Sequence, residues 1–270
     1  MLKDITIGQY FPGGSVLHRM DPRMKIILTM LYIVALFVAD NAQGLLLCGA
    51  LAAAGYLISG IPLSMLRKSM KPVLPIICFT AVLNMLFVEG ETLVALGFLR
   101  ITREGVVMAV LMVVRIVCLI AGSSLLTYTT SPIALTDGIE RLLAPLKRLR
   151  MPVHELAMMM TIALRFIPTL IEETDKIMSA QKARGADMES GGIVRRAKAM
   201  IPILIPLFVS SFRRADELAL AMECRCYHGD EGRTRMKQLA YAPRDFLGCA
   251  VLLALLAVTL LFNRIFPSMY

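Results

Sequence analysis

Five long apolar stretches limit what this sequence can fold into. They cover residues 24–39, 45–61, 72–88, 105–130 and 246–262. A helix needs about 20 residues to cross the hydrocarbon core of a bilayer, and most of these stretches approach that length. In total 57% of the residues are hydrophobic, which is more than an ordinary soluble domain carries. The sequence therefore predicts an all-α, polytopic membrane protein with about five transmembrane helices.

The basic residues predict how these helices are oriented. Of the 29 Lys and Arg residues, 25 fall on one side of the predicted spans, and 18 of them lie between residues 131 and 244. The opposite side holds only Arg100, Arg103 and Arg264, while Arg115 interrupts the fourth span. Cytoplasmic loops are the ones enriched in Lys and Arg. This distribution accounts for the net charge of +9 without a nucleic-acid partner.

Four regions follow from this topology. We expect a cytoplasmic N-terminal segment at residues 1–23, four transmembrane helices within 24–130, a cytoplasmic domain at 131–243 and a last transmembrane helix within 244–270, whose end lies outside the cell. The protein is thus expected in the cell membrane as a multi-pass protein. Its N-terminus carries charged residues and does not resemble a cleavable signal peptide.

The segment 131–243 predicts about three amphipathic helices. The first extends from Pro132 to about residue 150, the second from Pro152 to Arg184, and the third from about residue 193 to 226. Prolines 202 and 206 should kink or split the third helix. A charged, solvated connector is the alternative, but a connector seldom keeps uninterrupted apolar stripes. Such helices can lie along the membrane face.

Two stretches of this segment repeat each other at an offset of 41 residues. TLIEETDKIMSAQKAR ends at Arg184, and SSFRRADELALAMECR ends at Arg225. Asp175 matches Asp216 under the same offset. Each arginine has small neighbours, which leave its guanidinium protruding; these neighbours are Ala183, Gly185, Cys224 and Cys226. Either arginine alone could simply interact with the helix dipole, but two matched ones indicate a partner with two matched sockets.

Three parts of the sequence resemble a known family. They are GQYFPGGSVLHRMDPRMK near the N-terminus, PVHELAMMMTIALRFIPTLIEETDKIMSAQKARGAD, and PLFVSSFRRADELALAMECRCYHGDEGR. With them the chain resembles, over essentially its whole length, the transmembrane T component of energy-coupling factor (ECF) transporters, the EcfT family. The resemblance implies an ATP-driven importer of vitamins or metal ions. It also implies two ABC-type ATPase subunits and a small membrane S component that binds the substrate.

The resemblance assigns roles to individual residues. It implies that Ala183-Arg184-Gly185 and Cys224-Arg225-Cys226 dock into grooves on the two ATPases at the ends of coupling helices. The second motif departs from Ala-Arg-Gly, but cysteine is also small. The apolar stripes of these helices are expected to face the S component, which determines substrate specificity. The residues expected at this coupling-helix interface are Leu164, Ile177, Leu218 and Met222.

Other functions find less support in the sequence. No G-x-x-x-x-G-K-[ST] loop is present, so ATP and Mg²⁺ are expected on the partner ATPases, and the chain itself is expected to be non-catalytic and to need no cofactor or metal. Cys224, Cys226 and His228 could ligate a metal, but three ligands at one helix end are a weak signal. Arg115 has a functional role, snorkels towards the membrane surface or pairs with a polar backbone site. The main alternative is a self-contained permease whose own helices line the substrate path.

Overall fold

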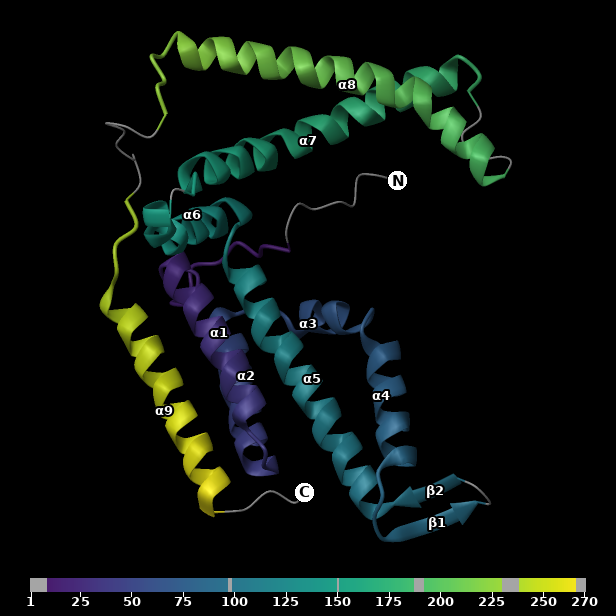
Figure 1. The fold of residues 1–270 in the computed structure, drawn as a ribbon, viewed down its shortest axis with the longest axis vertical. Coiled ribbons are helices and arrows are strands. Elements are labelled where there is room, and N and C mark those ends of the chain that lie inside the picture. The colour runs from purple at the N-terminus through teal and green to yellow at the C-terminus, as the bar shows by residue number, and fades with distance from the viewer. Residues whose placement is uncertain (1–8, 97–98, 150, 187–191, 230–237, 266–270) are drawn as a thin grey trace. The chain divides into compact units, whose positions relative to one another are not determined.

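The computed structural model describes residues 9–96, 99–149, 151–186, 192–229 and 238–265. Almost all regular structure in these ranges is helical (Figure 1). The helices are α1 Pro22–Val38, α2 Ala42–Ser59, α3 Leu63–Met70, α4 Leu74–Phe87, α5 Arg103–Thr129, α6 Pro132–Leu143, α7 Val153–Ala183, α8 Ile193–Glu223 and α9 Pro243–Ile265. The prediction of an all-α polytopic membrane protein is confirmed.

Two small elements were not expected. A 3₁₀ helix, Ala144–Leu149, follows α6, and an antiparallel hairpin joins α4 to α5. The hairpin pairs β1, Thr92–Leu96, with β2, Leu99–Thr102, so that Leu96 lies opposite Leu99. The helix α6 ends at Leu143, before its predicted end near residue 150. The cause is Pro145, which has no backbone N–H and disfavours the α conformation of the residue before it.

The predicted spans coincide with helices, but the set that qualifies by length and composition differs from the expected one. Among the described residues, α2, α5, α7 and α9 are long and apolar enough to cross a membrane, and α3 with α4 would make a fifth span bent by 64°. The helix α1 has only 17 residues, at the lower limit for a span. The helix α7 qualifies because its first half is apolar, although the sequence predicts it outside the membrane.

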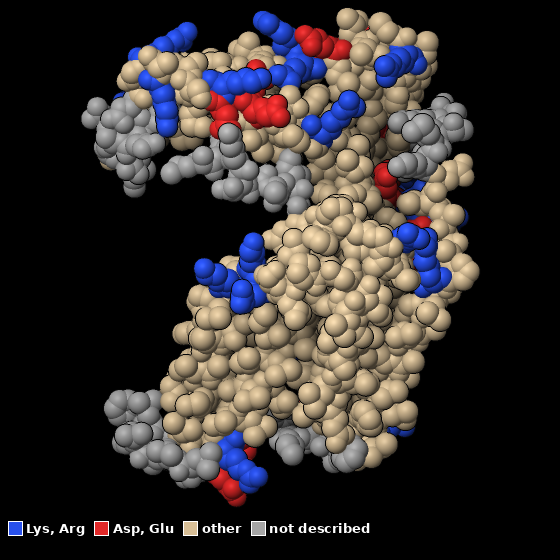
Figure 2. Space-filling view, turned by 180° about the vertical axis from the view of Figure 1, so that it is seen from behind, with Lys and Arg blue, Asp and Glu red and all other residues tan. Residues whose placement is uncertain are grey.

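The chain divides into two compact units. One, here called the bundle, comprises Gly8–Gly138 and Leu239–Tyr270; the other, here called the arm, comprises Ile139–Gln238. In the bundle, α5 contacts α1, α2, α3 and α4, and α9 contacts α1 and α2. The face of the bundle in Figure 2 carries almost no charged side chains between its ends, as expected for a surface in contact with lipid.

Close helix packing and buried hydroxyl groups form the core of the bundle. The Tyr32 side chain is buried, and its hydroxyl donates to the carbonyl oxygens of Cys48 and Cys118, at 3.2 and 3.3 Å. A Cβ at Gly122 would lie 2.2 Å from the Tyr32 ring, so only glycine fits there. The polar tip of a buried tyrosine thus finds partners where no water is expected.

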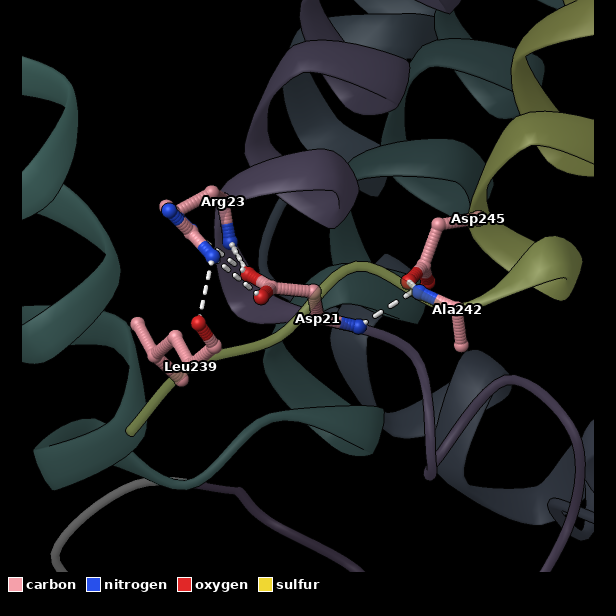
Figure 3. A network of polar contacts seen from close by, with 5 residues as sticks. All are labelled: Asp21, Arg23, Leu239, Ala242 and Asp245. Atoms are coloured by element: carbon pink, nitrogen blue, oxygen red, sulfur yellow. Dashed lines mark hydrogen bonds and ion pairs between the residues drawn. The ribbon is translucent and has the colours of Figure 1, made fainter. Parts of the chain in front are cut away.

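The N-terminal motif anchors the start of α1 to the start of α9 (Figure 3). Asp21 caps α1 and accepts hydrogen bonds from the backbone and side chain of Arg23. Asp245, fully buried, accepts from the backbone N–H groups of Asp21 and Ala242, at 3.0 and 2.7 Å. Arg23 also donates to the carbonyl oxygen of Leu239. Burial opposes ionisation of Asp21, but the hydrogen bonds from Arg23 outweigh it and hold the pKa of Asp21 below its usual value.

Lys25 closes the same end of the bundle. Its buried ammonium group donates to the carbonyl oxygens of His18 and Thr129 and to Oγ1 of Thr130, so all three of its hydrogen bonds are made inside the protein. Thr129 ends α5, and a cation is favourable at a helix C-terminus. The motif that the sequence predicts as the start of α1 therefore also holds α5 and α9.

Candidate functional site

The helix α7 ends at Arg184 in a well-defined C-terminal cap. Gly185 adopts a left-handed conformation with φ +85°. Its N–H donates to the carbonyl oxygen of Lys182 at 3.0 Å, and the N–H of Ala186 donates to that of Gln181 at 3.0 Å. These two bonds form a Schellman motif, which satisfies carbonyl groups that a helix end otherwise leaves free. The predicted end of this helix at Arg184 is confirmed.

The helix α8 ends in the same way, 41 residues later. Cys226 has φ +54° and takes the place of Gly185. Its N–H donates to the carbonyl oxygen of Glu223 at 2.9 Å, and the N–H of Tyr227 donates to that of Met222 at 3.1 Å. Arg225 therefore occupies the same cap position as Arg184. The repeat in the sequence corresponds to a repeat in backbone geometry.

Both arginines are accessible. Arg184 and Arg225 are exposed, as are their neighbours Ala183, Gly185, Cys224 and Cys226. Within the described part of the chain, neither guanidinium group makes a hydrogen bond or an ion pair. Each is a fully charged group with five donors, held at a helix end with space around it. Such a group can form a two-pronged pair with a carboxylate from another chain.

The helices α7 and α8 pack in antiparallel directions, which the sequence did not show. Gln181, near the end of α7, donates to the carbonyl oxygen of Pro202 near the start of α8, at 3.4 Å. Tyr227, just after α8, contacts the sulfur of Met158 near the start of α7, at 2.9 Å. Arg225 thus lies near residue 160, about 24 residues along α7 from Arg184, which corresponds to roughly 36 Å. The two arginines lie at opposite ends of the pair.

Pro202 and Pro206 do not split α8. The helix continues from Ile193 to Glu223 with both prolines inside it, and Figure 1 shows its ribbon changing direction in its N-terminal part. The four residues predicted at the coupling-helix interface are all half-buried in the arm: Leu164, Ile177, Leu218 and Met222. They lie on the two helices that pack together, and each remains accessible in part.

Arg115 has a backbone partner. Its Nη2 donates to the carbonyl oxygen of Ala39 at 2.6 Å, and Ala39 caps the C-terminus of α1. The Nε atom is buried without a partner among the described residues. Of the alternatives that the sequence left open for Arg115, the structure shows the polar backbone contact.

Three other features of the described residues bear on a candidate site: a buried His–Glu pair, possible metal ligands and a cavity. His154 and Glu140 pair at 3.1 Å and tie α7 to α6 within the arm. Among the described residues there is no group of three or more His, Cys, Asp or Glu that could hold a metal ion. A cavity of about 270 Å³ lies within the bundle, among α1, α2, α5 and α9, with an almost wholly apolar lining. Lys25 reaches it, but with its donors already used.

Sequence reasoning missed a polar contact between the two long helices. Glu173 accepts a hydrogen bond from the Ser210 hydroxyl at 2.5 Å and pairs with Arg214. The signal was available in the repeat, because Glu173 and Arg214 are matched positions of opposite charge. The packing of α7 against α8 brings them into contact.

A bundle of apolar helices and a pair of amphipathic helices that end in exposed arginines define a polytopic membrane protein. Comparison with known proteins specifies the class. A family model described as CbiQ, cobalt transport protein, matches residues 13–236.

Full-length relatives agree. The energy-coupling factor transporter transmembrane protein EcfT of Ruminiclostridium cellulolyticum is 53% identical over 266 residues, which cover 98% of this chain and 100% of the relative. The EcfT proteins of Acidaminococcus fermentans and Bacillus subtilis are 55% and 47% identical, over 94% and 98% of this chain and 95% and 100% of their own lengths. The chain belongs to the EcfT family, the transmembrane components of ECF transporters.

Proposed function

We propose that this chain is the coupling subunit of an importer for vitamins or transition-metal ions, and that it transmits the motion of two ATPase subunits to a substrate-binding S component. Arg184 docks into one ATPase and Arg225 into the other. The observation that carries this proposal is the pair of identical helix caps, each presenting an exposed guanidinium without a partner in the described chain.

The chemistry of arginine suits this role. A guanidinium remains charged at any physiological pH and binds a carboxylate through two parallel hydrogen bonds. Once it enters a groove and loses its water, such a contact commonly contributes about 2 kcal/mol or more to an interface. The small flanking residues leave room for the walls of a groove to close around the guanidinium.

The chain itself catalyses nothing in this proposal. ATP and Mg²⁺ bind to the ATPases, and the chain needs no cofactor. The partly accessible apolar residues of α7 and α8 contact the S component, through Leu164, Ile177, Leu218 and Met222. Motion imposed at Arg184 and Arg225, here called the arginine tips, would reach this surface through the two long helices.

The proposed orientation places the N-terminus and the arm in the cytoplasm, the C-terminus outside, and the protein in the cell membrane. Its support is the distribution of basic residues along the sequence. Of the 29 Lys and Arg residues, 25 fall on the proposed cytoplasmic side, and Arg100, Arg103 and Arg264 fall on the opposite side. A variant with Cys224 as its single cysteine should react with a membrane-impermeant maleimide only after the cells are permeabilised. Strong reaction in intact cells would place the arm outside.

Capture of partners tests the docking assignment. The tagged full-length chain, purified in mild detergent from native membranes, should bring two ATPases and a small hydrophobic protein with it. Arg184→Ala and Arg225→Ala should each reduce ATPase recovery. Arg165→Ala and Arg213→Ala are matched controls, because both arginines are exposed on the same helices but away from the tips. Unchanged recovery with the double tip variant would refute docking. Substrate uptake by the chain alone in liposomes would favour a permease.

A further inference from the structure

One polar cluster joins α7 to α8 midway between the two arginine tips. Oε1 of Glu173 accepts from the Ser210 hydroxyl at 2.5 Å, and Oε2 pairs with Nη2 of Arg214. The Glu173 and Arg214 side chains are 21% and 38% exposed, so the contact is shielded from water only in part. It is directional and charged; the hydrogen bond from Gln181 to the carbonyl oxygen of Pro202, also between the two helices, is long at 3.4 Å and lies near the end of α7.

The position of this cluster in the repeat is special. An offset of 41 residues carries Glu173 onto Arg214, so each partner contacts its own equivalent in the other helix. In an antiparallel pair of repeated helices, equivalent positions meet only where a local two-fold axis passes between the helices. Arg184 lies 11 residues after Glu173, and Arg225 lies 11 residues after Arg214. Each tip is therefore about 16 Å of helix from the axis.

Charge makes this contact possible. A true two-fold repeat would bring two identical residues together at its axis, and identical charges would repel each other. Here Glu173 faces Arg214, so the two equivalent positions carry opposite charges. The two copies have diverged in charge at the place where they meet, while they keep the same arginine at their tips.

We propose that Glu173, Ser210 and Arg214 form the pivot of the α7–α8 pair, which fixes the register of the two helices and so the spacing at which Arg184 and Arg225 meet a two-fold-related partner pair. The role in partner binding rests on the proposed function; the role in spacing does not. Apolar contacts would allow one helix to slip along the other, and a slip of one turn moves a tip by about 5.4 Å. The directional cluster prevents that slip. Glu173 and Arg214 act as positioning residues.

The spacing is measured on the full-length chain in lipid nanodiscs, without ATPases. Spin labels are placed at Ala183→Cys and at Cys224, with the other cysteines replaced, and their distance distribution is recorded. The unaltered pivot should give one narrow peak. Glu173→Gln and Arg214→Gln should each broaden and shift it, and the exchange of the two charges, Glu173→Arg with Arg214→Glu, should restore it. Glu172→Gln is the control, since Glu172 is an exposed neighbour, and it should change nothing.

The outcomes separate the pivot from the docking assignment. A distribution that stays narrow and unshifted in both single pivot variants overturns the pivot, and so does a charge exchange that folds but fails to restore the peak. If the pivot variants behave as expected but Arg184→Ala with Arg225→Ala still captures ATPases, the pivot stands and the docking role falls. Two linked contacts bind tightly only when their spacing matches the partner. Glu173→Gln should therefore also lower ATPase capture at least several-fold, with recovery in the charge-exchanged variant.

Discussion

The ends of α7 and α8 have the same backbone hydrogen bonds but different residues at the decisive position. The left-handed residue of the first cap is Gly185, and that of the second is Cys226. Glycine adopts this conformation without steric cost, whereas a residue with a Cβ atom pays about 1–2 kcal/mol. A Cβ at Gly185 would meet open space, so backbone conformation alone distinguishes the two ends.

This difference shows what the repeat preserves. The second copy has cysteine where the first has glycine, yet both have the same cap and an arginine before it. Non-glycine residues in this conformation persist where the surroundings require them, and they are frequent at functional sites. We interpret the shared feature as the position of the arginine at the helix end, which both copies retain.

Removal of both tips should have the largest effect. Arg184→Ala combined with Arg225→Ala should abolish ATPase capture and ATP-driven uptake, while the chain still inserts and folds, because helix-end arginines contribute little to its core. Pull-down and uptake assays measure this, with yield and thermal stability in detergent as controls. Retained ATPase capture would mean that neither end is a docking site.

Substitution of one arginine at a time tests whether the ends of α7 and α8 are equivalent. If the two ends are equivalent, Arg184→Ala and Arg225→Ala should each weaken ATPase binding by about 2 kcal/mol, or roughly 30-fold. Titration of each variant with the purified ATPase pair gives the two losses. A loss confined to one variant would show that the matching caps have different roles. Lysine at either position should be tolerated only in part, since it cannot form the two-pronged pair.

The apolar stripes should separate ATPase binding from coupling. Leu164→Asp or Leu218→Asp places a charge on a half-buried apolar position and should impair binding of the S component and uptake, while ATPases remain attached through the arginines. Co-purification of both partners from the same preparation measures this. The control is Glu172→Asp, which changes an exposed acidic residue. Loss of the ATPases together with the S component would contradict the division of roles.

The smallest effects test the caps themselves. Cys226→Gly should stabilise the last turn of α8, and Gly185→Ala should destabilise that of α7, each by about 1 kcal/mol. Hydrogen exchange of the amide groups in these turns should slow about five-fold in the first variant and accelerate about five-fold in the second. Equal exchange in Cys226→Gly and the unaltered protein would show that the cysteine is not strained.

Local signals in the sequence were sufficient for the long helices and for some of their ends. Apolar runs predict the spans because a helix in lipid must be apolar over its length, and Asp21-Pro22 and Gly185 mark a start and an end through their own backbone preferences. The arginine tips could also be found from the sequence, because the repeat keeps them in register. The short helix α3 and the hairpin were missed because each has too few residues to stand out beside the long apolar stretches.

Contacts between distant parts of the chain were decided by the tertiary structure alone. The sequence contains Asp245 and Lys25 but does not indicate that Asp245 accepts a hydrogen bond from the backbone of Asp21 at the start of α1. Nor does it indicate that Lys25 donates to the end of α5. It contains the repeat but not the antiparallel packing that separates the two arginines and places Glu173 against Arg214. Helix ends depend on neighbours in the chain, whereas register between helices depends on side chains that meet only after folding. The sequence by itself determined the two tips, and the packing of α7 against α8 determined their spacing.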